Sequence, residues 1–195
     1  MPFVSNPWLS ENTIEEREYQ EKIVKTALTG NTLCVLPTGL GKTNIAAIVS
    51  ANCLEKDMNG KILFLAPTRP LVAQHKKNFE KYFKAGLKMK IVTGEDKPEN
   101  RFYLYKGSEI LFSTPQTIRN DLKNNSINLK DFILCIFDEA HRSVGNYAYP
   151  FVAKRYMEQA KNPLILALTA SPGGHQQKIN EVKTKLFINN VEIRT

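Results

Sequence analysis

Long apolar runs are missing from this sequence, and cysteines are few. No apolar run reaches the roughly 20 residues needed to cross a bilayer, and residues 1–12 lack the basic and apolar regions of a secretion signal. Cys34, Cys53 and Cys135 are odd in number and widely spaced. That pattern is typical of reduced thiols rather than of disulfides or a metal cluster. We therefore expect an intracellular protein, cytoplasmic if its source is prokaryotic, with no membrane partner.

Acidic residues are also in the minority, since 19 Asp and Glu stand against 27 Lys and Arg, which gives a formal net charge of +8. A basic balance favours a polyanionic partner such as nucleic acid, although it is supporting evidence only. Internal repeats and low-complexity segments are absent from the sequence. A chain of 195 residues is long enough for one well-filled core. We expect an N-terminal arm over residues 1–12 and one domain over 13–195.

What the chain does contain is a phosphate-binding pattern, LPTGLGKT, at residues 36–43. An apolar run that is typical of a buried strand precedes it, and a segment with helical character follows. In such a turn the glycines let backbone N–H groups point inward, Lys42 can reach the β- and γ-phosphates, and the Thr43 hydroxyl can bind Mg²⁺. Leu36 departs from the general P-loop pattern, which has glycine there. The residues expected to bind the nucleotide in this turn are Pro37, Thr38, Gly39, Leu40, Gly41, Lys42 and Thr43.

Apolar strands alternate with helices along the rest of the chain. Strands that are apolar along their whole length indicate an α/β fold with a mostly parallel sheet, here of about seven strands, covered by helices on both faces. The strands are expected at residues 33–36, 62–66, 89–93, 109–113, 132–137 and 164–168, with a short one at 191–193. An N-terminal helix is expected to be capped by Asn12 or Thr13 and to run to about Leu28.

Polar residues collect where these strands end, and the carboxyl ends of parallel strands line the ligand crevice of such folds. Asp138 and Glu139 directly follow the most apolar strand. Asp138 can hold Mg²⁺ opposite the Thr43 hydroxyl, and Glu139 can orient or deprotonate the water that attacks the γ-phosphate. Alone, the two acids would be read as a solvated turn or a helix cap. Beside a P-loop the catalytic interpretation is favoured.

Five further polar side chains are weaker candidates when each is taken alone. Gln20 can donate to and accept from the edges of adenine, with Arg17 one turn before it, although an exposed glutamine is usually only solvated. His141 can hydrogen-bond on the γ-phosphate side or have a structural role. Thr169 and Ser171 could link to His141 through their hydroxyls, but such residues at a turn are usually caps.

Taken together, six segments resemble the ordered motifs of superfamily 2 helicases. They are REYQ at 17–20, LPTGLGKT at 36–43, APTRPLVAQ at 66–74, STPQTI at 113–118, DEAH at 138–141 and TAS at 169–171. The tract DEAHRSVGNYAY at 138–149 further resembles the archaeal Hef helicase/nuclease group and its eukaryotic relative in the Fanconi anaemia pathway, with the RIG-I-like RNA receptors a more distant match. The resemblance spans nearly the whole chain.

This resemblance implies a RecA-like motor domain that uses ATP and Mg²⁺. Gln20 and Arg17 would read adenine, Lys42, Asp138, Glu139 and His141 would serve hydrolysis, and Thr169 and Ser171, with His141, would couple nucleotide state to movement. The residues implied to contact the nucleic-acid backbone are Thr68, Arg69, Thr93, Gly94, Thr114 and Gln116.

Such helicases pair two RecA-like domains, and the second carries arginines that reach the γ-phosphate. Nothing after Ser171 resembles that second set. We therefore expect this chain to be a first motor domain, nearly inactive without its partner, from a helicase or translocase acting on forked or branched DNA in repair. The alternatives are an RNA helicase or RNA-sensing ATPase, and a nucleic-acid-binding module whose ATPase has lapsed.

Overall fold

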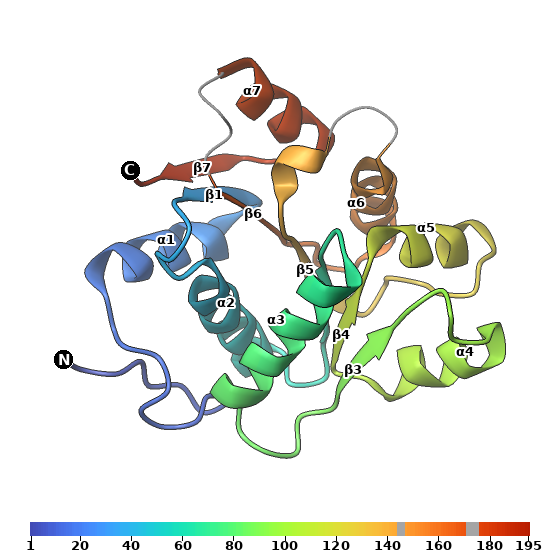
Figure 1. The fold of residues 1–195 in the computed structure, drawn as a ribbon, viewed down its shortest axis with the longest axis horizontal. Helices are drawn as coiled ribbons and strands as arrows, with labels where there is room; N and C mark the ends of the chain where they lie inside the picture. Colours follow the sequence, from blue (N-terminus) through green and yellow to red (C-terminus); the bar gives the residue numbers. More distant parts are fainter. Residues whose placement is uncertain (144–146, 171–175) are drawn as a thin grey trace.

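Seven strands form one parallel sheet in the computed structural model, which describes residues 1–143, 147–170 and 176–195 (Figure 1). The strand order is β3-β4-β2-β5-β6-β1-β7, and every pairing is parallel. The predicted α/β fold is confirmed. The strands are β1 (Thr32–Leu36), β2 (Lys61–Leu65), β3 (Met89–Val92), β4 (Ile110–Ser113), β5 (Phe132–Phe137), β6 (Ile165–Ala170) and β7 (Asn190–Ile193).

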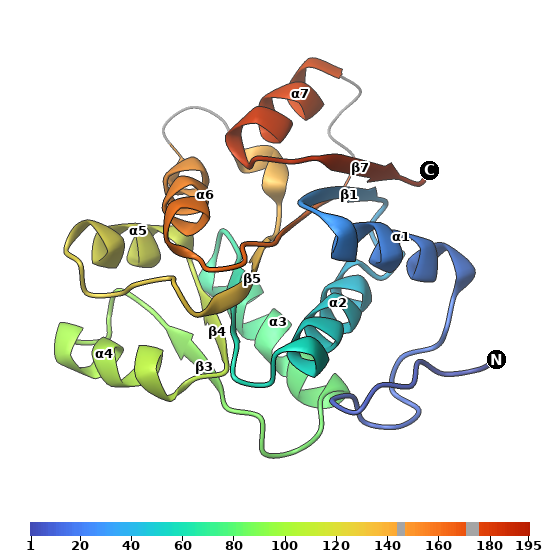
Figure 2. The ribbon, with the colours of Figure 1, turned by 180° about the vertical axis from the view of Figure 1, so that it is seen from behind.

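Helices cover both faces of this sheet, as the two opposite views show (Figures 1 and 2). Alternate residues of β2 enter different cores: Phe64 packs in the core under α1, α2 and α3, and Leu63 packs in the core under α4 to α7. Burial on both faces explains why the strands are apolar throughout. The helices are α1 (Glu18–Thr29), α2 (Lys42–Lys56), α3 (Arg69–Tyr82), α4 (Pro98–Gly107), α5 (Pro115–Lys123), the 3₁₀ turn η1 (Ala140–Arg142), α6 (Ala148–Gln159) and α7 (Gln176–Lys185).

The order of the strands decides which loops meet. Consecutive strands β1 and β2 are not neighbours, because β5 and β6 lie between them in the sheet. The loop after β1 and the loop after β5 are therefore separated by only one strand, β6, at the carboxyl edge. Ligands bind at such a reversal of strand order in open α/β sheets.

The expected start of the first helix is wrong, because α1 begins at Glu18 rather than after Asn12 or Thr13. The backbone of the preceding residues is bonded to the arm instead: Val4 N–H donates to the Ile14 carbonyl, and Glu16 N–H donates to the Pro2 carbonyl, both at 2.9 Å. Asn12 also adopts a positive φ of 60°. Trp8 packs against the core under α1 to α3.

Other features agree closely with the sequence interpretation. The short strand β7 pairs with β1 at one edge of the sheet. All three cysteines are buried and free, and burial raises the pKa of Cys34 and of Cys53 to about 12.

Within the described residues, the structure contains no helix with the length and apolarity required to span a bilayer. Ser171 lies outside the described residues.

Candidate active site

A cleft of about 440 Å³ opens at the carboxyl edge of the sheet, between the P-loop, α3 and the end of β5. Lys42 and Thr43 line it from one side, and Asp138 and Glu139 line it from another. Residues nearly a hundred positions apart in the chain thus share one cavity. The other lining residues are Thr38, Gly39, Gly41, Asn44, Leu71, Gln74, His75, Asn78, Tyr82 and Ala170.

The P-loop has the backbone geometry that its glycines permit. Gly39 and Gly41 have φ values of 88° and 80°, in the left-handed region that favours glycine. Helix α2 begins at Lys42, so its free N–H groups and positive dipole end lie at the cleft. The Lys42 ammonium donates to the Leu36 carbonyl at 3.1 Å. This arrangement suits a bound polyphosphate.

Helix α1 packs directly on this loop. A Cβ added at Gly41 would lie 2.5 Å from Nε2 of Gln20, so the Gln20 side chain lies directly against the backbone of the loop. Gln20 is 2% exposed, and the Tyr19 hydroxyl beside it donates to the Leu40 carbonyl at 2.9 Å. The Gln20 Oε1 atom is buried and has no hydrogen-bond partner among the described residues. It is an acceptor available to an amine such as that of adenine.

Arg17 does not share the buried environment of Gln20. Arg17 is the N-cap of α1, its side chain is 46% exposed, and its guanidinium lies 3.4 Å from the Glu15 carboxylate. The Arg17 pKa is raised, chiefly by a side-chain hydrogen bond from its guanidinium to the Tyr19 hydroxyl and second by one to the Glu15 carboxylate. Neither Arg17 nor Gln20 lines the cleft. Gln20 instead contacts the loop from behind.

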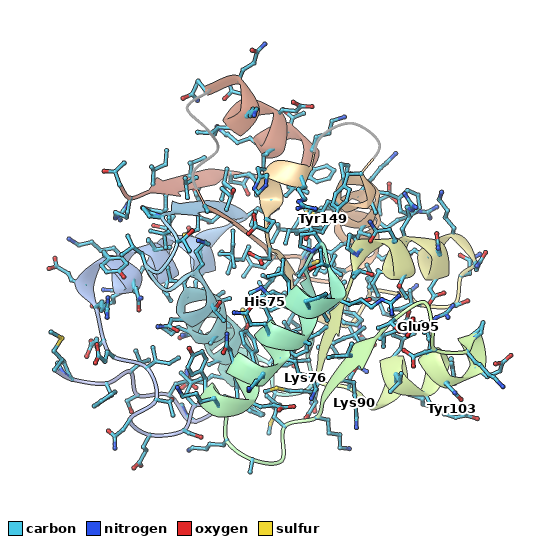
Figure 3. All side chains as sticks on the ribbon, viewed as in Figure 1. His75, Lys76, Lys90, Glu95, Tyr103 and Tyr149 are labelled. Carbon is cyan, nitrogen blue, oxygen red and sulfur yellow. The ribbon has the colours of Figure 1, made fainter. Side chains whose placement is uncertain are left out.

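Asp138 is held by three hydrogen bonds from three different elements. Its Oδ2 accepts from the Nε2–H of His75 at 2.7 Å, its backbone N–H donates to the carbonyl at the end of β2 at 2.9 Å, and its carbonyl accepts from the Tyr149 hydroxyl at 2.6 Å. Figure 3 labels both side chains, His75 on α3 and Tyr149 on α6. Asp138 is 5% exposed, and nothing in the described ranges donates to its Oδ1. One carboxylate oxygen is therefore free for a ligand.

These residues fit Mg²⁺, which is usually held by one or two carboxylates and by substrate phosphates rather than by a complete protein cage. The free oxygen of Asp138 and the Thr43 hydroxyl are hard oxygen donors on the same cleft. Consistently, the described part of the chain contains no cluster of three or more His, Cys, Asp or Glu that could bind a metal by itself.

Glu139 has an unusual backbone conformation, with φ 52° and ψ 46°. A non-glycine residue in the left-handed region is uncommon, and such strain is concentrated at functional sites. Its Oε2 lies 3.3 Å from Nδ1 of His141, and that nitrogen also lies 3.0 Å from the Thr169 hydroxyl at the end of β6. His141 and Thr169 are therefore brought together, and they lie beside the cleft rather than in its wall.

The sequence interpretation missed the contribution of α3 to this cleft. Leu71, His75, Asn78 and Tyr82 recur every three or four residues, so they share one face of the helix. The signal was available, because His75 lies one turn from Leu71 and one turn from Phe79, on an otherwise apolar face. Its partner Asp138 is 63 residues away, and that pairing has no local signature.

The six residues implied to contact nucleic acid lie in three adjacent loops, after β2, β4 and β3. Thr68 caps α3, because its Oγ1 accepts from the Leu71 N–H at 3.4 Å. Arg69 forms an ion pair with Glu95 at 2.5 Å, which joins the loop after β2 to the loop after β3. Thr93 N–H donates to the Asp96 carboxylate at 2.8 Å. The members of the set are Thr68, Arg69, Thr93, Gly94, Thr114 and Gln116.

A second buried carboxylate, Asp121 on α5, is linked through Arg101 to the loop after β3. Arg101 donates to both of its oxygens at 2.7 Å, and the Tyr105 hydroxyl donates to it as well. The Arg101 guanidinium also donates to the Asp96 carbonyl at 2.5 Å. Asp121 raises the pKa of Arg101, and burial raises that of Tyr105. The sequence interpretation assigned no role to this network.

Comparison with known proteins gives consistent results. The family model for DEAD/DEAH box helicase matches residues 17–179. The provisionally named ATP-dependent RNA helicase MJ1505 of Methanocaldococcus jannaschii is 45% identical over 99% of this chain and 24% of its own length. The ATP-dependent DNA helicase MPH1 of Vanderwaltozyma polyspora is 45% identical over 93% of this chain and 18% of its own.

Among solved structures, the crystal structure of the Pyrococcus furiosus Hef helicase domain has a TM-score of 0.90 and 48% identity. The match covers 96% of this chain and 40% of that one. This chain therefore spans a quarter or less of the curated relatives named above, and less than half of the solved helicase domain.

Proposed function

Because this chain belongs to the DEAD/DEAH box helicase family, which uses ATP, we propose that it is the first motor domain of a DNA helicase or translocase of the Hef type. It binds Mg-ATP in the cleft and nucleic-acid backbone on the adjoining loops. One observation carries the proposal: Lys42 and Thr43 on the P-loop share a cavity with Asp138 and Glu139. DNA is the proposed substrate, since MPH1 is named as a DNA helicase, and the resemblance to the Hef group points to forked or branched DNA in repair.

In this proposal the residues in and beside the cleft have separate tasks. Lys42 and the N-terminus of α2 bind the β- and γ-phosphates. Asp138 and Thr43 would hold Mg²⁺, which supplies positive charge against the phosphates. Glu139 accepts the proton of the attacking water. Gln20 accepts a hydrogen bond from adenine through its unpartnered Oε1 atom.

Nucleic acid would bind across the three loops at the other half of the carboxyl edge. Contacts to phosphates are independent of sequence, as translocation requires. A second RecA-like domain is the proposed protein partner, and it would supply arginines to the γ-phosphate. Such residues contribute about 10³ to 10⁵ in rate in related phosphoryl-transfer systems, so we expect slow hydrolysis by this chain alone.

Nucleotide affinity tests the site assignment. We expect Lys42→Ala to weaken binding of a fluorescent ATP analogue about 10- to 100-fold, because a hydrogen bond to a charged group contributes about 1.5–3 kcal/mol. Lys56→Ala is the matched control, since Lys56 ends the same helix and lies outside the cleft. Equal affinity of the two variants would remove the basis of the proposal.

Measurements of ATP turnover distinguish the proposed function from its two alternatives. MJ1505 is named as an RNA helicase. The rate of ATP turnover by a protein containing both motor domains should therefore be measured in the presence of forked DNA and, separately, of duplex RNA. Stronger stimulation by the RNA would favour the RNA helicase. Absence of turnover above background, in the unsubstituted protein as in Glu139→Gln, would instead indicate a binding module whose ATPase has lapsed.

A further inference from the structure

Helices α5 and α6 carry three cations, Arg119, Lys123 and Arg155, that the proposed motor site does not use. Gln116, Arg119 and Lys123 recur every three or four residues, so they share one face of α5. Phe151 and Arg155 are one turn apart on α6. The two helices pack against each other in the structure (Figure 1). We call these five residues the α5–α6 strip.

An aromatic ring holds the cations of this strip in place. The Lys123 ammonium lies 5.3 Å from the centroid of the Phe151 ring, and the Arg155 guanidinium carbon lies 5.2 Å from it. Both distances are within the range of cation–π contacts. Two cations from different helices are therefore arranged around one half-buried ring, and less side-chain freedom remains to be lost when an anion binds.

Among the described residues, none of Arg119, Lys123 and Arg155 forms an ion pair. The one carboxylate of α5, Asp121, is buried and bound to Arg101. The opposite face of the molecule differs, because on α1 Lys22 and Lys25 pair with the glutamates one turn before them, at 2.7 and 2.8 Å.

The strip also continues the loop at which nucleic acid is proposed to bind. Gln116 is both a member of the implied backbone-contact set and the first residue of the strip, and Thr114 precedes it as the N-cap of α5. From Gln116 to Lys123 the helix rises about 10 Å, which is the span of about three phosphates along one strand of a duplex. Repeated negative charge is the matching chemistry.

We infer that the α5–α6 strip binds the sugar-phosphate backbone of a nucleic-acid strand as it leaves the loops at the carboxyl edge. The inference rests on the proposed function and extends its nucleic-acid path to a new surface. An acidic protein is the less suitable partner, because protein interfaces need an apolar core. None of the large hydrophobic side chains that are exposed in the described residues lies on α5 or α6.

The salt dependence of DNA binding tests this inference. The variant Lys123→Gln with Arg155→Gln removes two charges from the strip, and Lys22→Gln with Lys25→Gln removes two from α1. For duplex DNA between 50 and 200 mM salt, we expect the first pair to reduce the slope of log affinity against log salt by about 1.8, that is, about 0.9 for each phosphate contact. The second pair should leave the slope unchanged, and Arg155→Gln alone should give half the effect.

The outcomes are distinct. Equal slopes for the two double variants, with unchanged melting temperatures, would overturn the inference while leaving the proposed function intact. Failure of the unsubstituted chain to bind any DNA or RNA would instead contradict the proposed function. Binding to poly-glutamate that is lost in the strip variant, with DNA binding unaffected, would show that the surface meets an acidic protein and would also overturn the inference.

Discussion

Two buried aspartates, Asp121 and Asp138, differ in how completely their carboxylates are occupied. Asp121 is 1% exposed, and Arg101 and Tyr105 engage both of its oxygens. Asp138 is 5% exposed, and His75 engages one oxygen only. A buried carboxylate whose hydrogen bonds are all made contributes to structure, whereas one with a free oxygen beside a cleft can bind a ligand.

The largest effect on stability is expected at Asp121, whose carboxylate oxygens are both hydrogen-bonded. Arg101→Met should lower the free energy of unfolding by about 3–5 kcal/mol, because removal of one partner leaves the other charge buried and uncompensated. Urea unfolding measures this, with Lys106→Met on the exposed part of the same helix as the control. A loss below about 1 kcal/mol would mean that the network does not stabilise the loops above it.

A smaller effect on stability is expected when Asp138 loses its hydrogen bond from His75. His75→Phe preserves the ring that packs against Phe64 at a centroid distance of 4.5 Å but removes the donor to Asp138. It should cost about 1–3 kcal/mol, the range for a buried group left without its hydrogen bond. His75→Gln restores an N–H donor and should recover most of the loss. Equal unfolding free energies for Phe and Gln would exclude a role for the hydrogen bond.

The smallest change in stability is expected for Asp138→Asn, below about 1 kcal/mol. An amide can still accept from His75 and costs less to bury than a charge. The same substitution should abolish the Mg²⁺ dependence of nucleotide affinity, which titration of a fluorescent nucleotide with and without the metal measures. Asp121→Asn is the matched control, and it should show the reverse: a large loss of stability with the metal dependence retained.

The sequence predicted most of the fold because the determinants of the fold are local. Apolar runs such as residues 132–137 are buried on both faces, and the glycines at 39 and 41 are required by positive φ values. The start of α1 was missed because the backbone of Ile14 and Glu16 forms hydrogen bonds with Val4 and Pro2 instead of helical ones. The helix propensity of residues 12–17 does not show these hydrogen bonds, because their partners lie about ten or more residues earlier in the chain.

The candidate site could be predicted only in part for a related reason. Motifs at strand ends identified Lys42 and Asp138, and the sheet brings them to one cleft. The hydrogen bond between His75 and Asp138 and the ion pair between Arg101 and Asp121 join separate segments, and neither belongs to a recognised motif. Their partners depend on how α3 and α5 pack. The catalytic, coupling and nucleic-acid roles of the individual residues stay predictions until the variants are measured.

Helix α3 has a mechanical consequence for the motor. Its 14 residues begin with Arg69 in a loop proposed to hold nucleic acid, and two turns later His75 holds the carboxylate of Asp138. A helix moves as a stiff rod, so a displacement of one end by a bound strand carries His75 with it. Arg69 and His75 are separated by about 9 Å along the helix axis, and Asp138, the proposed metal ligand, is hydrogen-bonded to His75 at the middle of α3.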